Sequence, residues 1–120
     1  MILKSLFKQY DRNIMTTVDE QSNGGQITLK RDDILRIDLH ERGTAGYRWT
    51  LEPIVHPVCS LMDDTHDEGD PRPGNELVRS WKFKAEKTGD ETIALRYHRS
   101  WESSGDGMER EFKISVSVVE

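Results

Sequence analysis

One cysteine and four histidines are the residues of this chain that could supply nucleophilic chemistry. Cys59 could act as a thiol nucleophile if a histidine base lay beside it, and the candidate bases are His40, His56, His66 and His98. However, Cys59 lies in Val58-Cys59-Ser60-Leu61, a predicted strand with neither a glycine turn nor a helix N-terminus to activate a thiol. Free cysteines are commonly buried in protein cores. The sequence therefore favours a buried structural thiol, and we expect no enzyme activity.

An acidic run, Asp63-Asp64-Thr65-His66-Asp67-Glu68-Gly69-Asp70, is the one candidate metal cluster. A 12-residue calcium loop ends in a glutamate, whereas the corresponding residue counted from Asp64 is Asn75. The chain also lacks paired histidines at metal spacing and a glycine-rich phosphate loop. We expect a solvated acidic loop that could complement a basic partner, with no metal and no cofactor.

The segment Gly43-Thr44-Ala45-Gly46-Tyr47-Arg48-Trp49 is suited to binding rather than to catalysis. Glycines at both ends permit backbone angles that other residues resist, and small residues between them keep the loop slim. Tyr47 and Trp49 then fall on one face of the following strand, where they can pin the loop to a core. A slim, pinned loop can be inserted into a cleft of another molecule.

Composition limits the class of protein that carries this loop. The 120 residues are enough for one domain with its own core, and 34% of them are hydrophobic while 32% are charged. The 17 basic and 22 acidic residues give a formal net charge of −5, which argues against nucleic acid as a partner. A lone cysteine requires no oxidising compartment, and no apolar run is long enough to span a bilayer. We expect a monomer that binds neither nucleic acid nor membrane.

Alternation of apolar and polar residues predicts an all-β chain. One face of each predicted strand is apolar, as in the series Leu35, Ile37, Leu39; Trp81, Phe83, Ala85; Ile93, Leu95, Tyr97; and Phe112, Ile114, Val116, Val118. Turn residues separate these runs, for example Ser22-Asn23-Gly24-Gly25 and Thr88-Gly89-Asp90. Short strands at this spacing predict an immunoglobulin-like β-sandwich of about seven to eight mostly antiparallel strands.

The order of the strands places three loops at one end of the sandwich. If strand 34–40 runs upward and each strand crosses the sandwich in turn, the loops 41–46, 64–76 and 99–107 all lie at the top. A rigid scaffold that holds several loops together is the usual basis of a binding surface.

The second and third of these loops carry residues suited to binding. Asp70-Pro71-Arg72-Pro73-Gly74-Asn75 has two prolines that limit flexibility, and Arg99-Ser100-Trp101 places a cation beside a large aromatic ring. Buried Trp and Arg side chains each contribute about 2 kcal/mol or more to many interfaces. The alternative for Trp101 is a core aromatic at the end of a strand.

These three motifs, in this order, resemble the chagasin-like inhibitors of papain-family cysteine peptidases. The first loop with Tyr47 and Trp49 is similar to the family signature N-P-T-T-G-[aromatic]-x-W, and residues 95–102 are similar to its Y-x-R-P-W/F segment. Residues 71–76 stand where the family has a glycine-rich G-x-G-G loop. The resemblance extends from about Thr16 to Val119.

The resemblance implies a reversible, non-covalent inhibitor whose three loops form a wedge that blocks the cleft of a papain-family cysteine peptidase. The loops would contact the catalytic centre and the two cleft walls through Gly43, Thr44, Ala45, Gly46 and Tyr47; Arg72, Pro73, Gly74 and Asn75; and Arg99, Ser100 and Trp101. Trp49 matches a tryptophan with a structural role. Tyr47 belongs to the binding set, although its alternation with Trp49 also fits a core position.

The chain departs from the family pattern in all three loops. Arg42-Gly43 replaces Asn-Pro, Ala45 replaces a threonine, Ser100 replaces a proline, and Pro71 and Pro73 replace glycines. A first loop without proline must lose more conformational entropy on binding. These departures leave open a second hypothesis, a non-inhibitory protein-binding module that uses the same loop surface.

The first residues are expected to stand apart from the domain. Met1-Ile2-Leu3-Lys4-Ser5-Leu6-Phe7-Lys8 is interrupted by charges and lacks a small-residue cleavage site, so a secretory signal is not indicated. We expect a flexible extension over 1–14, a domain over 15–120 and a cytoplasmic location, with Met15 as an alternative start and a periplasmic or secreted location left open.

Overall fold

The computed structural model describes residues 14–41, 47–54, 56–66, 77–99 and 110–120. Eight strands and one short 3-10 helix make up these ranges. In chain order they are β1 Met15–Val18, η1 Glu20–Ser22, β2 Gln26–Lys30, β3 Ile34–Glu41, β4 Tyr47–Leu51, β5 Cys59–His66, β6 Leu77–Ala85, β7 Gly89–Arg99 and β8 Arg110–Val119. Within the described ranges no helix is long and apolar enough to cross a membrane.

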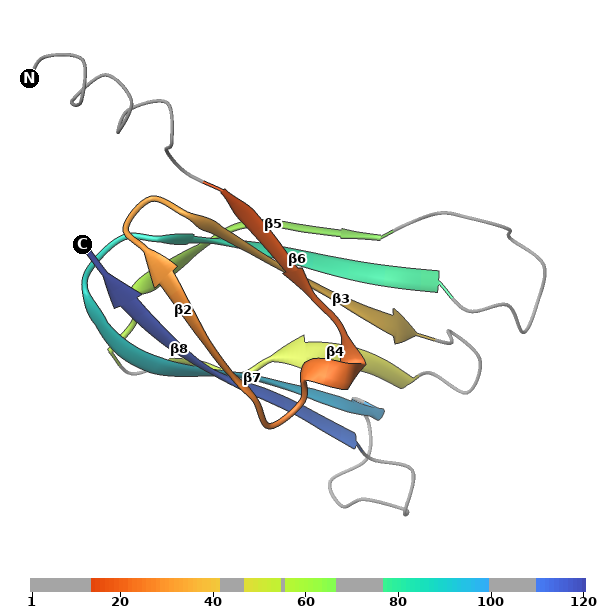
Figure 1. Cartoon of the computed structure of the whole chain (residues 1–120). Helices are drawn as coiled ribbons and strands as arrows, with labels where there is room; N and C mark the ends of the chain where they lie inside the picture. The colour runs from red at the N-terminus through yellow and green to blue at the C-terminus, as the bar shows by residue number, and fades with distance from the viewer. Residues whose placement is uncertain (1–13, 42–46, 55, 67–76, 100–109) are drawn as a thin grey trace, which may run out of the picture.

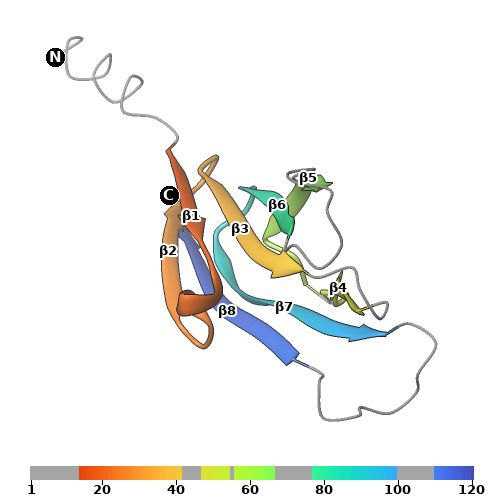
Figure 2. The ribbon, with the colours of Figure 1, turned by 90° about the vertical axis from the view of Figure 1, so that its right-hand side faces the viewer.

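The strands form two four-stranded sheets that pack face to face (Figures 1 and 2). One sheet has the order β1-β3-β6-β5 and the other has the order β2-β8-β7-β4. The pairs β3–β6, β5–β6, β4–β7 and β7–β8 are antiparallel, whereas β1–β3 and β2–β8 are parallel. The predicted all-β, mostly antiparallel sandwich is therefore confirmed.

The inward face of each strand is the apolar series that alternation predicted. Every other residue of β3 and β6 is almost fully buried, and so are the facing positions of β7 and β8. The largest fully buried side chains are Trp81, Phe83, Phe112, Leu29, Leu35, Ile37, Leu39, Ile93, Leu95 and Val116. Burial of a side chain of this size stabilises a fold by about 1.5–3 kcal/mol, so these positions hold the two sheets together.

The structure extends and corrects several predicted elements. β5 continues to His66, so the first part of the predicted 64–76 loop is strand, and β7 already begins at Gly89. A bulge between Leu61 and Asp63 shifts the register of β5 against β6. The sequence did not predict strands β1 and β2. They lie at sheet edges and have only four and five residues, so their alternation of apolar and polar side chains is too short to be distinctive.

The described chain starts one residue before β1. The Ile14 N–H donates to Asp33 Oδ1 at 3.1 Å, and the Ile14 carbonyl accepts from the Ile34 N–H at 2.9 Å. Ile14 therefore continues the pairing of β1 with the β3 region. Residues 1–13 lie outside the described ranges, so a flexible extension and the domain boundary stay predictions.

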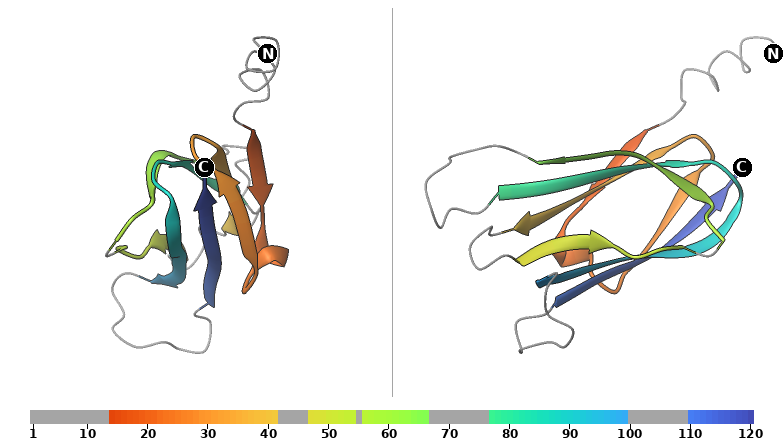
Figure 3. Two further views of the ribbon diagram at one scale, coloured as in Figure 1. Left: turned by 60° about the vertical axis from the view of Figure 1, so that its left-hand side comes forward. Right: turned by 180° about the vertical axis from the view of Figure 1, so that it is seen from behind.

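Six strand ends meet at one end of the sandwich (Figure 3). Here β3, β5 and β7 finish at Glu41, His66 and Arg99, and β4, β6 and β8 begin at Tyr47, Leu77 and Arg110. The register pairs Glu41 with Leu77 and Tyr47 with Arg99, so the ends are aligned within each sheet. We call this the loop end, because it borders the three segments 42–46, 67–76 and 100–109. The strand order that the sequence predicted around these segments is confirmed.

Candidate functional site

Most residues of the predicted binding surface lie outside the described ranges. Of the set, the structure describes Tyr47 and the backbone of Arg99, which pair across β4 and β7. The remaining members are Gly43, Thr44, Ala45, Gly46, Arg72, Pro73, Gly74, Asn75, Ser100 and Trp101. Their role stays a prediction. What the structure does show is the frame to which the three segments are attached.

An aromatic cluster joins the strands at the bases of the first and third segments. Tyr47 is only 7% exposed, and its ring stacks on Tyr97 of β7 with 5.4 Å between centroids. The Trp49 ring also contacts Tyr97, with 5.0 Å between centroids, and the Arg110 guanidinium of β8 lies 5.8 Å from the centroid of the Tyr97 ring. The predicted placement of Tyr47 and Trp49 on one inward face of the strand is therefore confirmed. Whether these rings also pin segment 42–46 stays a prediction, because that segment lies outside the described ranges.

Glu41 and Trp49 hold the two strands that flank segment 42–46. The carboxylate of Glu41 is buried and accepts a hydrogen bond from the Trp49 backbone N–H at 2.9 Å. In return, the Trp49 indole Nε1–H donates to the His40 carbonyl at 2.9 Å. Because β3 and β4 belong to different sheets, these two bonds join the sheets at the strand ends that flank residues 42–46 in the chain.

Arg79 completes a buried polar cluster beside this pair. Its Nη1 donates to Glu41 Oε2 at 3.2 Å and to the Trp49 carbonyl at 3.3 Å, and its Nη2 donates to Asp64 Oδ1 at 2.8 Å. The guanidinium also lies over the Trp81 ring, 4.7 Å from its centroid. Arg79 and Glu41 are each less than a tenth exposed, so their charges interact with little screening by solvent.

Sequence reasoning missed this cluster, although the signal was present. The apolar series 35, 37, 39 of β3 continues to Glu41, and the series 85, 83, 81 of β6 continues to Arg79. Opposite charges at inward positions, at the same end of two adjacent strands, indicate a buried ion pair. Arg79 is the centre of the cluster, because its guanidinium contacts Glu41, Trp49 and Asp64.

A second acidic residue reaches the loop end from η1. Glu20 accepts from the His40 backbone N–H at 2.5 Å, and its Oε2 lies 3.1 Å from His40 Nδ1. Burial alone would raise the pKa of Glu20, but the hydrogen bonds from His40 outweigh it and lower that pKa overall. At pH values above the pKa that Glu20 has in the unfolded chain, its carboxylate therefore stabilises the end of β3. This stabilisation is lost as the pH falls through the lower pKa of the folded state.

The candidate nucleophile lies at the opposite end of the sandwich. Cys59 is 4% exposed, and its backbone N–H and that of Val58 both donate to Glu91 Oε1 at 2.7 Å. Burial, followed by the nearby Glu91 carboxylate, raises the pKa of the Cys59 thiol to about 12. A thiol with this pKa is protonated at neutral pH, which agrees with a structural role and not with a nucleophile.

This environment predicts the chemistry of Cys59. In the native protein at pH 8 the thiol should react with a disulfide reagent such as dithionitrobenzoate far more slowly than in the unfolded chain. Because the folded pKa exceeds the unfolded one, unfolding releases a proton between pH 9 and about 12. The free energy of unfolding should therefore fall across that window, and urea titrations should show a smaller fall for Cys59→Ala. An equal fall in both proteins would contradict the assignment.

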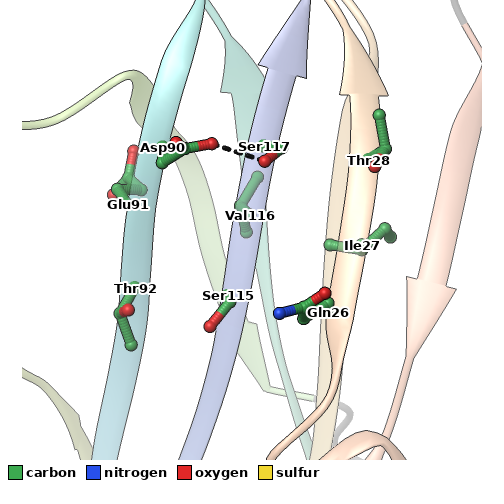
Figure 4. Close-up of a pocket in the computed structure, with 9 residues that line it drawn as sticks. All are labelled: Gln26, Ile27, Thr28, Asp90, Glu91, Thr92, Ser115, Val116 and Ser117. Carbon is green, nitrogen blue, oxygen red and sulfur yellow. Dashed lines mark hydrogen bonds between the residues drawn. The ribbon is translucent and has the colours of Figure 1, made fainter.

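The described part of the acidic run and one surface hollow are two further candidate sites. Asp64 pairs with Arg79, and no group of three or more His, Cys, Asp or Glu suited to a metal occurs among the described residues. A hollow of about 430 Å³ lies on the sheet β2-β8-β7 and is lined by Gln26, Ile27, Thr28, Asp90, Glu91, Thr92, Ser115, Val116 and Ser117 (Figure 4). It lies toward the start of β7, away from the loop end, and a hydrogen bond from Ser117 to Asp90 crosses it.

Similarity to known proteins extends over most of the chain. Residues 28–116 match the sequence profile described as Chagasin family peptidase inhibitor I42. Amoebiasin-2 of Entamoeba histolytica is 30% identical over 104 residues, which cover 83% of this chain and 80% of that protein.

Solved structures of similar proteins share the sandwich. The crystal structure of the cysteine protease inhibitor EhICP2 from Entamoeba histolytica superposes with a TM-score of 0.76 at 25% identity, over 89% of this chain and 97% of that one. PbICP-C, solved in complex with falcipain-2, gives a TM-score of 0.63 at 20% identity over 89% and 91% of the two chains, and this likeness concerns the fold. With its sandwich, its aligned loop end and a profile match that covers most of its length, the chain belongs to the chagasin family of peptidase inhibitors.

Proposed function

We propose that the chain is a reversible, non-covalent inhibitor of papain-like cysteine peptidases and that its loop end enters the active-site cleft. The observation that carries the proposal is the convergence of six strand ends around segments 42–46, 67–76 and 100–109. Membership of a peptidase inhibitor family supports it, as does the similarity to EhICP2, a cysteine protease inhibitor.

The frame suits insertion because it fixes the base of the first segment. Glu41 and Trp49 join the two flanking strands, and Tyr47 packs against Tyr97, so little of the base is free to move. A segment held at both ends loses less conformational entropy when a partner binds it. This fixed base compensates for the proline that the first segment lacks.

The mechanism is steric occlusion. A slim segment over the catalytic cysteine would exclude substrate without placing a peptide bond in position for attack, and the inhibitor itself performs no chemistry. The predicted partners of the cleft are Gly43 to Gly46 at the centre, with residues 72–75 and 99–101 on the two walls. PbICP-C, a protein of the same fold, was solved in complex with falcipain-2.

The test is an inhibition titration against papain and a cathepsin L–type peptidase. We expect dose-dependent, reversible inhibition, with the intact chain recovered after incubation. Absence of inhibition at micromolar concentration, combined with a pull-down that recovers no peptidase, would instead favour the non-inhibitory binding module.

A further inference from the structure

We infer that Arg79 is a positioning residue that fixes the bases of the first and second segments relative to one another. The inference rests on the proposed function, because it assigns Arg79 a role in presenting segments 42–46 and 67–76 to a peptidase. Arg79 is buried, so its effect must pass through the strands that it contacts.

One guanidinium contacts every strand that flanks the two segments. Its Nη1 reaches Glu41 at the end of β3 and the Trp49 carbonyl near the start of β4, which are the strands on either side of 42–46. Its Nη2 reaches Asp64 near the end of β5, and Arg79 itself lies near the start of β6, on either side of 67–76. A displacement of either base must therefore change the hydrogen bonds of the other.

The chemistry of the cluster indicates positioning more than stability. Replacement of a buried ion pair by well-packed apolar residues is often neutral or stabilising, and the next inward residues, Leu39 and Trp81, are apolar. The Asp64 side chain is 41% exposed, and an ion pair with such an exposed partner contributes little to the free energy of folding. The buried Nε of Arg79 also has no hydrogen-bond partner among the described residues, and an unsatisfied buried donor costs free energy of folding.

What an arginine supplies here is fixed geometry. Its planar fork directs several N–H groups at set angles, whereas a lysine at the same position offers one mobile charge. Three acceptors on three strands use that fork: Glu41 Oε2, the Trp49 carbonyl and Asp64 Oδ1. Without these directed hydrogen bonds, we expect the ends of β3, β4, β5 and β6 to sample more relative positions, so a smaller fraction of molecules would be ready to bind.

The experiment compares Arg79→Lys and Asp64→Asn with Arg36→Lys in the full chain. Arg36 belongs to the same sheet and contacts Asp38 at 2.7 Å and Ser80 at 3.3 Å, but on the outer face and outside the cluster. Binding to papain is followed by stopped flow, and the folded state is checked by thermal unfolding. A smaller binding-competent fraction lowers the association rate constant, so we expect at least a tenfold fall for Arg79→Lys and a smaller fall for Asp64→Asn. Arg36→Lys should associate like the wild type.

Two results would overturn the inference. One is a folded Arg79→Lys that associates as fast as the wild type, and the other is an equal loss in Arg36→Lys. If Arg79→Lys does not fold, Asp64→Asn decides in the same way, because it removes the charge of the acceptor next to the second segment and weakens that contact alone. If the wild type fails to bind, the proposed function is wrong, and amide exchange then decides the inference separately: faster exchange at Glu41 and Trp49 in Arg79→Lys supports it, and unchanged exchange overturns it.

Discussion

Replacement of Glu41 by alanine is expected to lower the free energy of unfolding by about 3–5 kcal/mol, since it leaves the buried Arg79 charge without its buried partner and with Asp64, which is 41% exposed, as the remaining carboxylate. The same substitution removes the acceptor of the buried Trp49 N–H. Urea titration followed by circular dichroism measures the change.

A matched control is Glu52→Ala. Glu52 also pairs with an arginine, Arg96, but at 3.7 Å and with both side chains more than a third exposed. Loss of such a surface pair changes stability by about 1 kcal/mol or less. The double variant Glu41→Gln, Arg79→Met should regain stability relative to Glu41→Ala, because it removes the buried charge that Glu41→Ala leaves poorly compensated. Equal, small effects of Glu41→Ala and Glu52→Ala would show that Arg79 does not depend on Glu41 to compensate its buried charge.

Replacement of Trp101 by alanine is expected to weaken inhibition at least tenfold, or about 1.4 kcal/mol of binding free energy. The prediction rests on the sequence, which places a large aromatic beside Arg99 in the third segment, next to the strand end that pairs with Tyr47. Tryptophan and arginine dominate many interfaces when a partner buries them.

Two measurements on the same protein separate this role from the alternative. If Trp101 anchors a partner, Trp101→Ala raises the inhibition constant and leaves the melting temperature close to that of the wild type. If Trp101 is instead a core aromatic, the melting temperature falls clearly, because truncation of a buried tryptophan costs about 3–5 kcal/mol. Unchanged inhibition would mean that the third segment has been assigned the wrong role.

The sandwich could be predicted because its strands obey one simple rule. A strand with one buried face alternates apolar and polar residues, and β3, β6, β7 and β8 do so over most of their length. Because successive strands cross the sandwich in alternate directions, three segments could be placed at one end before it was known which strands are hydrogen-bonded to each other. Strands β1 and β2 follow the same rule, but only over four and five residues, and so short a run is not distinctive in a sequence.

The frame of the site was harder to predict than the segments that it holds. The glycines and aromatics of Gly43 to Trp49 are a recognisable loop pattern. Glu41 and Arg79 look like ordinary surface charges unless the inward–outward alternation of their strands is extended to these positions. Asp64 belonged to a run predicted to be a solvated loop, and the bulge in β5 that precedes it is not visible in the sequence. An ion pair between strands that are far apart in the sequence depends on which residues face each other across the sheet. The alternation of apolar and polar residues alone does not define that register.

The central claim, that the loop end occupies the active-site cleft, is tested most directly by calorimetric titration of the chain into two forms of papain. One form has its catalytic cysteine replaced by alanine, and the other has its cleft filled by a covalently attached peptidyl inhibitor. The proposed function predicts one-to-one binding to the alanine form, because the inhibitor needs no covalent bond, and loss of binding to the filled form. Equal binding to both forms, or binding to neither, would contradict it.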